Sequence, residues 1–584
     1  MNVKDQIVKA LEGITKEKGI NLEFPENPEF GDYTTNVAMV CAKKSEKNPR
    51  VLAEEITKEL KENHNLESII EKIEVAGPGF INFWLKKDIL LSNLIQIDIQ
   101  KEKYGTSDLE KGKTWGIEHT SPNPNKAMHL GHLRNNVTGM AIANLAEAMG
   151  VKVIRDCVDN DRGIAIAKLM WGYLKFAKKG DVSLDIDYWF DHPEEWQTPD
   201  EMKMRPDRFV DQFYVKGSVD FEVDKGVEEK VRKLVVDWEA EDSKVWALWK
   251  KVLDYSYQGQ EITLKRLGNR WDTVWHEHEH YKAGKDLVEL GIKKGIFKKL
   301  DDGVVITDLS KYKLPDTVVI KSDGTALYIT QDLALTRLKK DKFKAEKLFW
   351  VIGPEQSLAM QQMFAVCEQL GIGHIKDFKH LAYGYMSIKG QGKMSSRLGN
   401  VIYIDDLLDL AKGKVKKIMD GSDFDADKIE EISETVGVGA VKYSILKVGR
   451  LQDVAFDINE SVSVEGNSGP YIQYTIARTN SVLAKVETKN ETLKVGEELN
   501  NEELAVLKSL IRFPEVIENA AVNYSPNLLC NYLYDLAQKY NGFYNKYRIL
   551  DSDNLIFRLK LTSATGQVLK NGLKLLGIGS PEKM

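Results

Sequence analysis

The sequence predicts an α/β fold, with a parallel β-sheet in a central domain, a smaller α+β domain before it and an all-α bundle after it. Three observations support this fold class. Residues 115–158 read as a strand, a turn-rich loop, a helix and a second strand, which is typical of a right-handed βαβ unit. Residues 1–106 mix helical and strand patterns, whereas from residue 451 onward almost every segment has helical periodicity. A chain of 584 residues is also too long for one hydrophobic core.

The first domain, residues 1–106, combines helices with a pair of strands. Helices are expected over 3–18 and 49–63, where apolar residues recur at helical spacing. The segment KIEVAGPGFINFWL predicts two strands, because Gly77-Pro78-Gly79 interrupts a strand-like run. The N-terminal residues alternate charged and apolar side chains and lack the apolar stretch of a signal peptide.

The central domain, residues 107–450, begins with the βαβ unit and then carries an insertion. Trp115–Glu118 and 151–158 are the predicted strands, and Gly150 fits the end of the helix between them. Residues 165–262 are rich in Trp, Asp and Lys and have helical stretches, which favours an inserted subdomain. The sheet is expected to resume in three apolar runs, Val318–Ile320, Leu348–Ile352 and Leu381–Met386. Parallel sheets bind ligands at the carboxyl ends of their strands.

Composition and charge limit the class of protein. The 42% hydrophobic and 29% charged content is that of an ordinary folded, soluble protein. No run of about 18 apolar residues occurs, so no membrane-spanning helix is expected. The net charge of −6 argues against a protein that coats nucleic acid, although a local basic face allows a specific RNA partner. Four cysteines lack the spacing of a zinc site or a disulfide framework, which favours a reducing cytoplasm: Cys41, Cys157, Cys367 and Cys530.

The motif HLGH, residues 129–132, stands where a loop turns into the predicted helix. The free N–H groups and the positive dipole end of a helix N-terminus attract phosphate. The imidazoles of His129 and His132 can both donate hydrogen bonds to a triphosphate as charge develops in a transition state. Gly131 leaves space for an adenine ring against the backbone. Four residues alone are weak evidence, because two histidines at a helix start commonly cap it or lie exposed.

A Gly-, Ser- and Lys-rich segment, IKGQGKMSSRLGN at 388–400, follows an expected strand far downstream. A mobile loop that carries a lysine can close over a triphosphate and neutralise the pyrophosphate as it leaves. Lys393 would supply that charge in this segment. By itself such a loop is typically a solvated connection.

Together the two motifs resemble those of the arginyl-tRNA synthetases, a class I family. SPNPNKAMHLGHLRN, residues 121–135, is similar to the family's HIGH region, and KMSS is similar to its KMSKS loop. The resemblance implies a class I Rossmann catalytic domain that binds ATP through Gly131, His129, His132, Met394, Ser395 and Ser396. FGDYTTNVAM and GPGFINFWL resemble an N-terminal domain that contacts the tRNA elbow. GPYIQYTIARTNSVL, in 451–584, resembles an anticodon-binding bundle.

Three positions depart from the family pattern. Ser396 stands where the general KMSKS motif has a second lysine, so the loop lacks one phosphate-facing charge. Lys126 lies three residues before His129, and we hypothesise that it replaces the lost lysine beside the catalytic His129, His132 and Lys393. Ile476 and Ala359 stand where many family members have histidine.

The segment SDGTALYITQDLA, residues 322–334, resembles the family's arginine-binding stretch. A guanidinium needs planar acceptors, usually carboxylates placed for bidentate bonds. The resemblance implies that Asp332 holds the guanidinium, with the Tyr328 hydroxyl alongside on the same helix face. Four further positions match substrate contacts, the last by a looser alignment: Glu118, Asn123, Gln356 and Glu277. Asn123 and Gln356 suit the α-amino and carboxylate end. Lysine, bound in place of arginine, would leave some of these acceptors unpaired, so the site should discriminate strongly against it. No editing domain is therefore expected.

The run His276-Glu-His-Glu-His280 was weighed as a metal site. On a strand its three histidines would share one face, as in a chelate. However, the spacing matches no usual zinc motif, and the run falls in the substrate-contact region. We therefore assign no metal ligands and expect these histidines to pack or to line the pocket.

The resemblance implies an arginine–tRNA ligase, which forms arginyl-adenylate from L-arginine and ATP and transfers the arginine to the 3′ adenosine of tRNA(Arg). Mg²⁺ with the ATP, a monomer and no membrane partner are expected. Another class I synthetase is one alternative, but a cysteinyl enzyme needs a Cys/His zinc site, and the N-terminal domain argues against cysteinyl and glutamyl enzymes alike. An inactive, RNA-binding relative is opposed by the intact His129, His132 and Lys393. A small HxGH nucleotidyltransferase would not need 584 residues.

Overall fold

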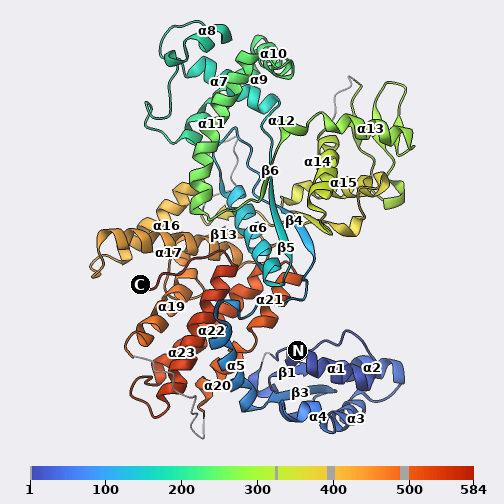
Figure 1. Ribbon diagram of the computed structural model, residues 1–584, viewed down its shortest axis with the longest axis vertical. Coiled ribbons are helices and arrows are strands. Elements are labelled where there is room, and N and C mark those ends of the chain that lie inside the picture. The colour runs from blue at the N-terminus through green and yellow to red at the C-terminus, as the bar shows by residue number, and fades with distance from the viewer. Residues whose placement is uncertain (1–2, 26, 323–326, 391–401, 487–498) are drawn as a thin grey trace. The chain divides into compact units, whose positions relative to one another are not determined.

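The computed structural model describes residues 3–25, 27–322, 327–390, 402–486 and 499–584. They form two compact units. Unit 1 comprises Met1–Tyr104, Arg478–Pro514 and Asp535–Leu569, and unit 2 comprises Gly105–Ala477, Glu515–Tyr534 and Lys570–Met584. Four helices contribute residues to both units (Figure 1): α19 (Gly469–Leu483), α21 (Phe513–Val522), α22 (Pro526–Lys546) and α23 (Leu555–Leu575). The domain boundaries at 106 and 450 stay a prediction.

Unit 1 contains a three-stranded antiparallel sheet with helices around it. The strand order is β1 (Tyr33–Thr35), β3 (Phe80–Leu85) and β2 (Ile70–Ala76). The turn between β2 and β3 requires glycine, because Gly77 and Gly79 have φ angles of 52° and 130°. The predicted pair of strands is therefore confirmed. The helices are α1 (Val3–Thr15), α2 (Val37–Ser45), α3 (Pro49–Lys61), α4 (His64–Glu67), α5 (Lys87–Gln100) and α20 (Asn501–Leu510), with 3-10 turns at Pro28–Phe30 and Lys101–Lys103.

Unit 2 is built on a five-stranded parallel sheet. In spatial order its strands are β11 (Phe378–His380), β10 (Lys347–Trp350), β4 (Thr114–Glu118), β5 (Lys152–Asp159) and β6 (Thr273–His276). Helix α6 (Leu130–Ala148) connects β4 to β5 and ends before Gly150, whose φ of 88° suits glycine. After β6 the chain returns to the other side of β4, so the strand order reverses between β4 and β10. The predicted βαβ unit and parallel sheet are confirmed.

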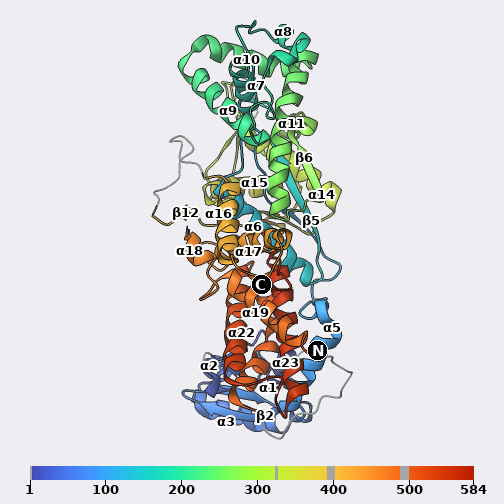
Figure 2. The same ribbon diagram turned by 90° about the vertical axis from the view of Figure 1, so that its left-hand side faces the viewer.

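Five helices fill the connection between β5 and β6, where an insertion was expected. They are α7 (Ile164–Phe176), α8 (Ile186–Asp191), α9 (Pro206–Val223), α10 (Lys225–Glu239) and α11 (Ser243–Arg266), with a 3-10 turn at Pro193–Glu195. Trp196 and Phe209 are fully buried in a core of their own. Gly172 and Gly217 let α7 and α9 touch, because a Cβ on either would lie about 2 Å from a backbone oxygen. Figures 1 and 2 show these helices beyond one edge of the sheet.

The remaining elements of unit 2 cover the sheet and extend it. There are two short sheets. One is antiparallel and contains β7 (Phe297–Lys299), β8 (Val305–Thr307) and β9 (Val318–Ile320). The other is the parallel pair of β12 (Met386–Ile388) and β13 (Val454–Phe456). The helices are α12 (Glu277–His280), α13 (Ala283–Lys293), α14 (Tyr328–Phe343), α15 (Ser357–Leu370), α16 (Ile404–Ile418), α17 (Ala426–Leu446) and α18 (Ile458–Ser461). Turns of 3-10 type are Ser310–Tyr312, Pro354–Gln356 and Ile375–Asp377. No helix in the described ranges combines the length and apolar character needed to cross a membrane.

Three strand predictions were wrong in detail. Val318–Ile320 is β9, which pairs antiparallel with β8 and not with the parallel sheet. Only ten residues separate β8 from β9, too few for the crossover that a parallel pair needs. The strand expected at Leu381–Met386 lies earlier in the chain, as β11, and ends at His380. The polar Lys379 obscured this strand in the sequence, although an edge strand tolerates such a residue. Strand β13 lies in the segment after residue 451 that was expected to be helical.

Candidate active site

The predicted site residues collect beyond the carboxyl ends of the parallel strands. Glu118 is the last residue of β4, and Glu277 directly follows β6. Gln356 lies in the turn after β10, and the HLGH motif lies between β4 and α6. The strand order reverses between β4 and β10, and open parallel sheets bind ligands at such a reversal.

His129 and His132 cap the N-terminus of α6 reciprocally. Nδ1 of His129 accepts a hydrogen bond from the backbone N–H of Gly131 at 3.2 Å, and Nδ1 of His132 accepts one from the N–H of His129 at 3.2 Å. A neutral imidazole carries one hydrogen, so acceptance at Nδ1 places that hydrogen on Nε2. Each ring therefore keeps its Nε2–H as a donor that takes no part in the cap, beside the free N–H groups at the start of the helix.

Both imidazoles are neutral at neutral pH. Burial, together with the nearby Lys126, lowers the pKa of His129 to about 4. Burial also holds the pKa of His132 well below its usual value. A Cβ on Gly131 would lie 3.1 Å from the His129 ring, so the glycine makes room for this histidine. Neutral rings with a free N–H can donate hydrogen bonds to phosphate oxygens without first losing or gaining a proton.

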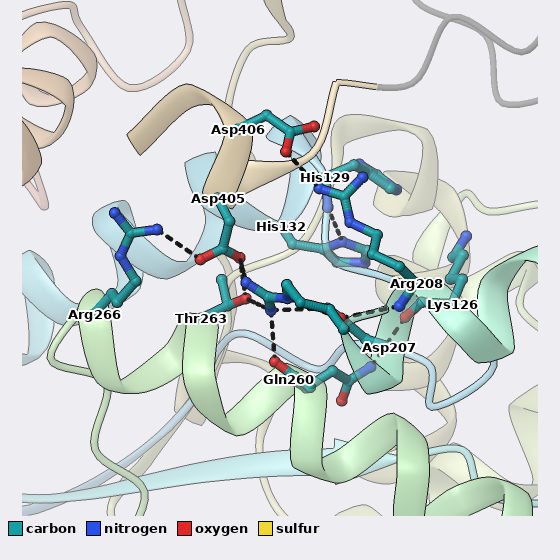
Figure 3. Close-up of polar contacts among 12 residues, drawn as sticks. Lys126, His129, His132, Asp207, Arg208, Gln260, Thr263, Arg266, Asp405 and Asp406 are labelled. Atoms are coloured by element: carbon teal, nitrogen blue, oxygen red, sulfur yellow. Dashed lines mark hydrogen bonds and ion pairs between the residues drawn. The ribbon is translucent and has the colours of Figure 1, made fainter. Parts of the chain in front are cut away.

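Lys126 lies in the same region as the two histidines (Figure 3). Its carbonyl accepts a hydrogen bond from Nε2 of Gln260 on α11, at 3.3 Å. Burial lowers the pKa of its ammonium group, while the carboxylate of Asp211 on α9 raises it. The ammonium group of Lys126 therefore lies close enough to Asp211 and to His129 to interact with both electrostatically.

Residues 402–406, which follow the predicted lysine loop, are anchored on both the HLGH loop and α9. Tyr403 forms an antiparallel bridge with His129, and its hydroxyl donates to Asp211 at 2.6 Å. The guanidinium of Arg208 lies 3.2 Å from the centre of the Tyr403 ring and donates to Asp406 at 2.9 Å. The described residues that follow the predicted lysine loop thus lie beside the histidines, with Asp405 and Asp406 near His129 and His132 in Figure 3.

Asp405 is a second anchor of the same segment. Its side chain is buried at the start of α16 and binds Arg205 at 2.8 Å and Arg266 at 2.9 Å. The Thr263 hydroxyl also donates to it. These partners outweigh the effect of burial and lower the pKa of Asp405. Sequence reasoning missed this network, because the arginines lie far earlier in the chain and carry no motif.

The predicted catalytic residue Lys393 and three predicted ATP-binding residues, Met394, Ser395 and Ser396, lie outside the described residues. Their roles stay predictions. The side chain of Tyr328, at the first position of α14, also lies outside the described part.

Three carboxylates predicted to bind arginine come together at the sheet edge. Asp332, on α14, lies close enough to Glu118 and Glu277 for both to raise its pKa by repulsion. Asp332 is exposed to solvent. Lys339, only 2% exposed, binds Glu118 at 2.7 Å and Asp156 at 2.5 Å beneath them.

Two of these carboxyl groups have raised pKa values. Loss of hydration is the largest cause and, with repulsion from Glu118, raises the pKa of Asp332 to about 7. Burial likewise raises the pKa of Glu277 to about 7, against the attraction of Arg162. The two cations Lys339 and Arg162 lie among four acidic groups, which are Glu118, Asp156, Glu277 and Asp332. A planar cation with several N–H donors would complete the set, and a guanidinium is such a group.

Asn123 and Gln356 lie exposed on loops at the same edge of the sheet. The side-chain oxygen of Asn123 accepts a hydrogen bond from Asn160 at 3.2 Å. Both amides therefore stand where a substrate can reach them. Lys339 is the functional residue that sequence reasoning overlooked, although it lies seven residues after Asp332 and so on the same helix face.

Comparison with known families decides which of the class I enzymes this site resembles. The catalytic domain described as class I (R) tRNA synthetases matches residues 93–458. The chain belongs to the arginyl-tRNA synthetase family. The arginyl-tRNA synthetase N-terminal domain matches residues 1–85, and the DALR anticodon-binding domain matches residues 472–584. Membership of the arginyl family excludes the cysteinyl and glutamyl alternatives.

Individual arginyl-tRNA synthetases match over the whole chain. The arginine–tRNA ligase of Treponema denticola is 35% identical over 99% of this chain and 98% of its own length. That of Flavobacterium psychrophilum is 35% identical over 92% of this chain and 90% of its own. The solved arginyl-tRNA synthetase of Thermus thermophilus superposes with a TM-score of 0.82 at 24% identity and covers 100% of both chains. The last likeness shows the shared fold.

Proposed function

We propose that the chain is an arginine–tRNA ligase, which joins arginine to ATP as arginyl-adenylate and then transfers it to the 3′ adenosine of tRNA(Arg). The observation that carries this proposal is the cluster of Glu118, Glu277 and Asp332 at the same sheet edge as the HLGH cap. An acidic pocket beside a phosphate-binding helix end suits a guanidinium amino acid and a triphosphate together.

Arginine would enter with its guanidinium against Asp332 and the hydroxyl of Tyr328. Glu118 would add a second acceptor, held in place by Lys339. Glu277 would contribute a third carboxylate from the end of β6. Asn123 and Gln356 would bind the α-amino and carboxylate end of the amino acid. Lysine has no planar fork, so it would leave part of this acceptor set unpaired and be rejected.

ATP would bind across the start of α6, with its adenine near Gly131. The Nε2–H groups of His129 and His132 would donate to the phosphates as negative charge develops on them. Lys126 and Lys393 would supply cations from two sides, and Met394, Ser395 and Ser396 would complete the loop over the nucleotide. Mg²⁺ would arrive with ATP as part of the nucleotide substrate.

We also infer the roles of the other parts of the chain. Residues 1–106 would contact the tRNA elbow, 107–450 would form the catalytic domain, and 451–584 would read the anticodon. We expect a monomer located in the cytoplasm. Activation of arginine is expected to require bound tRNA.

ATP–pyrophosphate exchange with each of the twenty amino acids, with and without total tRNA, tests the proposal. We expect exchange with arginine alone and only in the presence of tRNA. Exchange with another amino acid would overturn the pocket assignment. An absence of exchange under every condition would favour an inactive RNA-binding protein and would direct attention to Ser396.

The raised pKa values predict a pH dependence of arginine recognition. The ionised forms of Asp332 and Glu277 bind the guanidinium, and both pKa values lie near 7 in the empty pocket. Lowering the pH from 8 to 6 should therefore weaken kcat/KM for arginine by about tenfold for each carboxyl group that titrates. The kcat/KM for ATP, measured over the same range, is the control. An arginine profile that is flat over this range would contradict the prediction.

Lys126→Ala tests the hypothesis that this lysine replaces the second lysine of the KMSKS motif. We expect pyrophosphate exchange to fall by roughly 30- to 1,000-fold, equivalent to about 2–4 kcal/mol, because the charge acts in the transition state. Lys250→Ala is a matched control, since this lysine is exposed on α11. Exchange by Lys126→Ala within about twofold of the unmodified enzyme would reject the hypothesis.

A further inference from the structure

A cluster of two aspartates and two histidines lies where β5 and β6 end, outside the arginine and ATP contacts. Asp159 is the last residue of β5 and Asp161 follows it, while His276 ends β6 and His278 lies in α12. Nδ1 of His276 is 2.8 Å from Asp159 and 3.5 Å from Asp161. Nδ1 of His278 contacts the same oxygen of Asp161.

The donor atoms of this cluster already lie near the spacing of a tetrahedral metal site. Metal–nitrogen and metal–oxygen bonds of about 2.0–2.1 Å place neighbouring donors about 3.3 Å apart. One oxygen of Asp161 and one ring nitrogen from each of His276 and His278 all lie within 4.8 Å of one another. The two rings are 35% and 26% exposed, so small rotations would bring their nitrogens onto one ion. His280, which lies further along α12, is not part of this group.

The charges of the cluster also suit a divalent cation. Asp159 and Asp161 are 4% and 1% exposed, and buried carboxylates are stabilised by nearby positive charge. A divalent ion would supply such charge with both imidazoles neutral, which is their form as metal ligands. One oxygen of Asp159 is buried without a hydrogen-bond partner among the described residues. Asp159 lies outside the group of three donors that are mutually within 4.8 Å, so it contributes charge beside the site and is not counted as a ligand.

The cluster is reachable from solvent. A cleft of about 570 Å³ opens onto Asp161, His276 and His278, with Trp249 and Tyr257 among its walls. The Tyr257 hydroxyl donates to Asp159 at 2.5 Å and the backbone N–H of His278 donates to Asp161 at 3.0 Å. Both carboxylates are thereby oriented, as metal-binding carboxylates usually are.

We propose that Asp161, His276 and His278 form a binding site for a divalent transition metal such as Zn²⁺. Two imidazole nitrogens favour zinc and its neighbours over Mg²⁺ or Ca²⁺, which prefer oxygen ligands only. This assignment replaces the expectation that the histidines merely pack or line the pocket. The three histidines do not share a strand face, because His278 and His280 lie in α12, yet the turn at the end of β6 brings His276 and His278 onto one carboxylate.

A metal at this position would join the ends of β5 and β6. Glu277 lies between the two histidine ligands, so the ion would also fix the segment that presents this carboxylate to the pocket. The alternative is a set of His–Asp hydrogen bonds that never admits a metal. The two possibilities differ in a direct measurement of metal binding, which requires neither ATP nor tRNA.

Co²⁺ binding to the metal-free, full-length chain tests the proposal, because tetrahedral cobalt absorbs visible light much more strongly than octahedral cobalt. We expect one equivalent of Co²⁺ to give a tetrahedral spectrum, which Zn²⁺ abolishes by displacement. His276→Asn and His278→Asn should each weaken Co²⁺ binding at least about tenfold. His280→Asn is the matched control from the same run and should bind as the unmodified chain does.

A second measurement, of thermal stability, distinguishes a variant that has lost a metal-binding side chain from a variant that fails to fold. Zn²⁺ should raise the Tm of the unmodified chain and of His280→Asn, because a ligand that binds only the folded state stabilises it. The rise should disappear in His276→Asn and His278→Asn, whose metal-free Tm should stay close to that of the unmodified chain. An octahedral spectrum, no saturable binding, or equal weakening in all three variants would overturn the proposal.

Discussion

Asp332→Asn is expected to lower kcat/KM for arginine in tRNA-dependent pyrophosphate exchange by about 100- to 1,000-fold. Truncation of one partner in an enclosed, hydrogen-bonded charge pair costs about 2–5 kcal/mol, and each 1.4 kcal/mol is tenfold. Asparagine keeps the size and the planar shape of the side chain but removes the negative charge that is proposed to bind the guanidinium. The kcat/KM for ATP should change much less, because the HLGH cap is untouched.

The structure supplies a matched control on the same helix. Asp341 is exposed on α14 and pairs only loosely with Arg337, at 3.9 Å, so Asp341→Asn should leave exchange within about twofold. The Asp332→Asn protein should also keep its Tm, because an ionised Asp332 is repelled by Glu118 and Glu277 in the empty pocket. A variant with unchanged arginine kinetics would show that Asp332 is not the guanidinium partner.

His129→Asn is expected to reduce the rate of arginyl-adenylate formation by about 100- to 1,000-fold, equivalent to roughly 2.7–4 kcal/mol for one lost donor to a charged transition state. Asparagine is a good N-cap, so its side-chain oxygen can replace Nδ1 of His129 as the acceptor for Gly131. The Nε2–H donor is lost, however. The variant therefore separates the donor function from the capping function.

Two comparisons make this measurement decisive. His129→Ala removes both the cap and the donor, and should add about 1 kcal/mol of destabilisation to the same loss of rate. His374 caps the turn Ile375–Asp377 with the same reciprocal pair of bonds, so His374→Asn is a control for the exchange of histidine by asparagine at a cap. If His129→Asn retains the full rate, the ring acts only as a cap.

Local signals explain which parts of the fold could be predicted. The strand before HLGH, the helix after it and Gly150 at its end follow one another in the sequence, so periodicity and a turn residue were enough. The run Val318–Ile320 was misplaced because three apolar residues fit a parallel or an antiparallel sheet equally well. Its partner β8, and not its own composition, determines its position.

The residues of the candidate site, like the elements of the fold, differ in whether a local sequence signal marks them. Glu118, Asn123 and the two histidines lie within fifteen residues of one another, in motifs that the sequence displays. Lys339 could not be placed, because its function comes from two carboxylates on β4 and β5 that meet it only in the folded sheet. The same holds for Asp405, whose arginine partners come from α9 and α11. Side chains that position others carry little signal in a single sequence.

The Lys339 ion pairs also set an order of events during synthesis. Lys339 is 221 residues downstream of Glu118, so at about 5–20 residues per second the ribosome takes roughly 10–45 s to supply the cation after the carboxylate. During that interval Glu118 and Asp156 cannot be buried without a large cost, because no positive charge is yet present to compensate them. The centre of the sheet should therefore stay hydrated until α14 emerges. A nascent chain that stops before residue 339 should be more easily digested by protease at β4 and β5 than one that extends past β11.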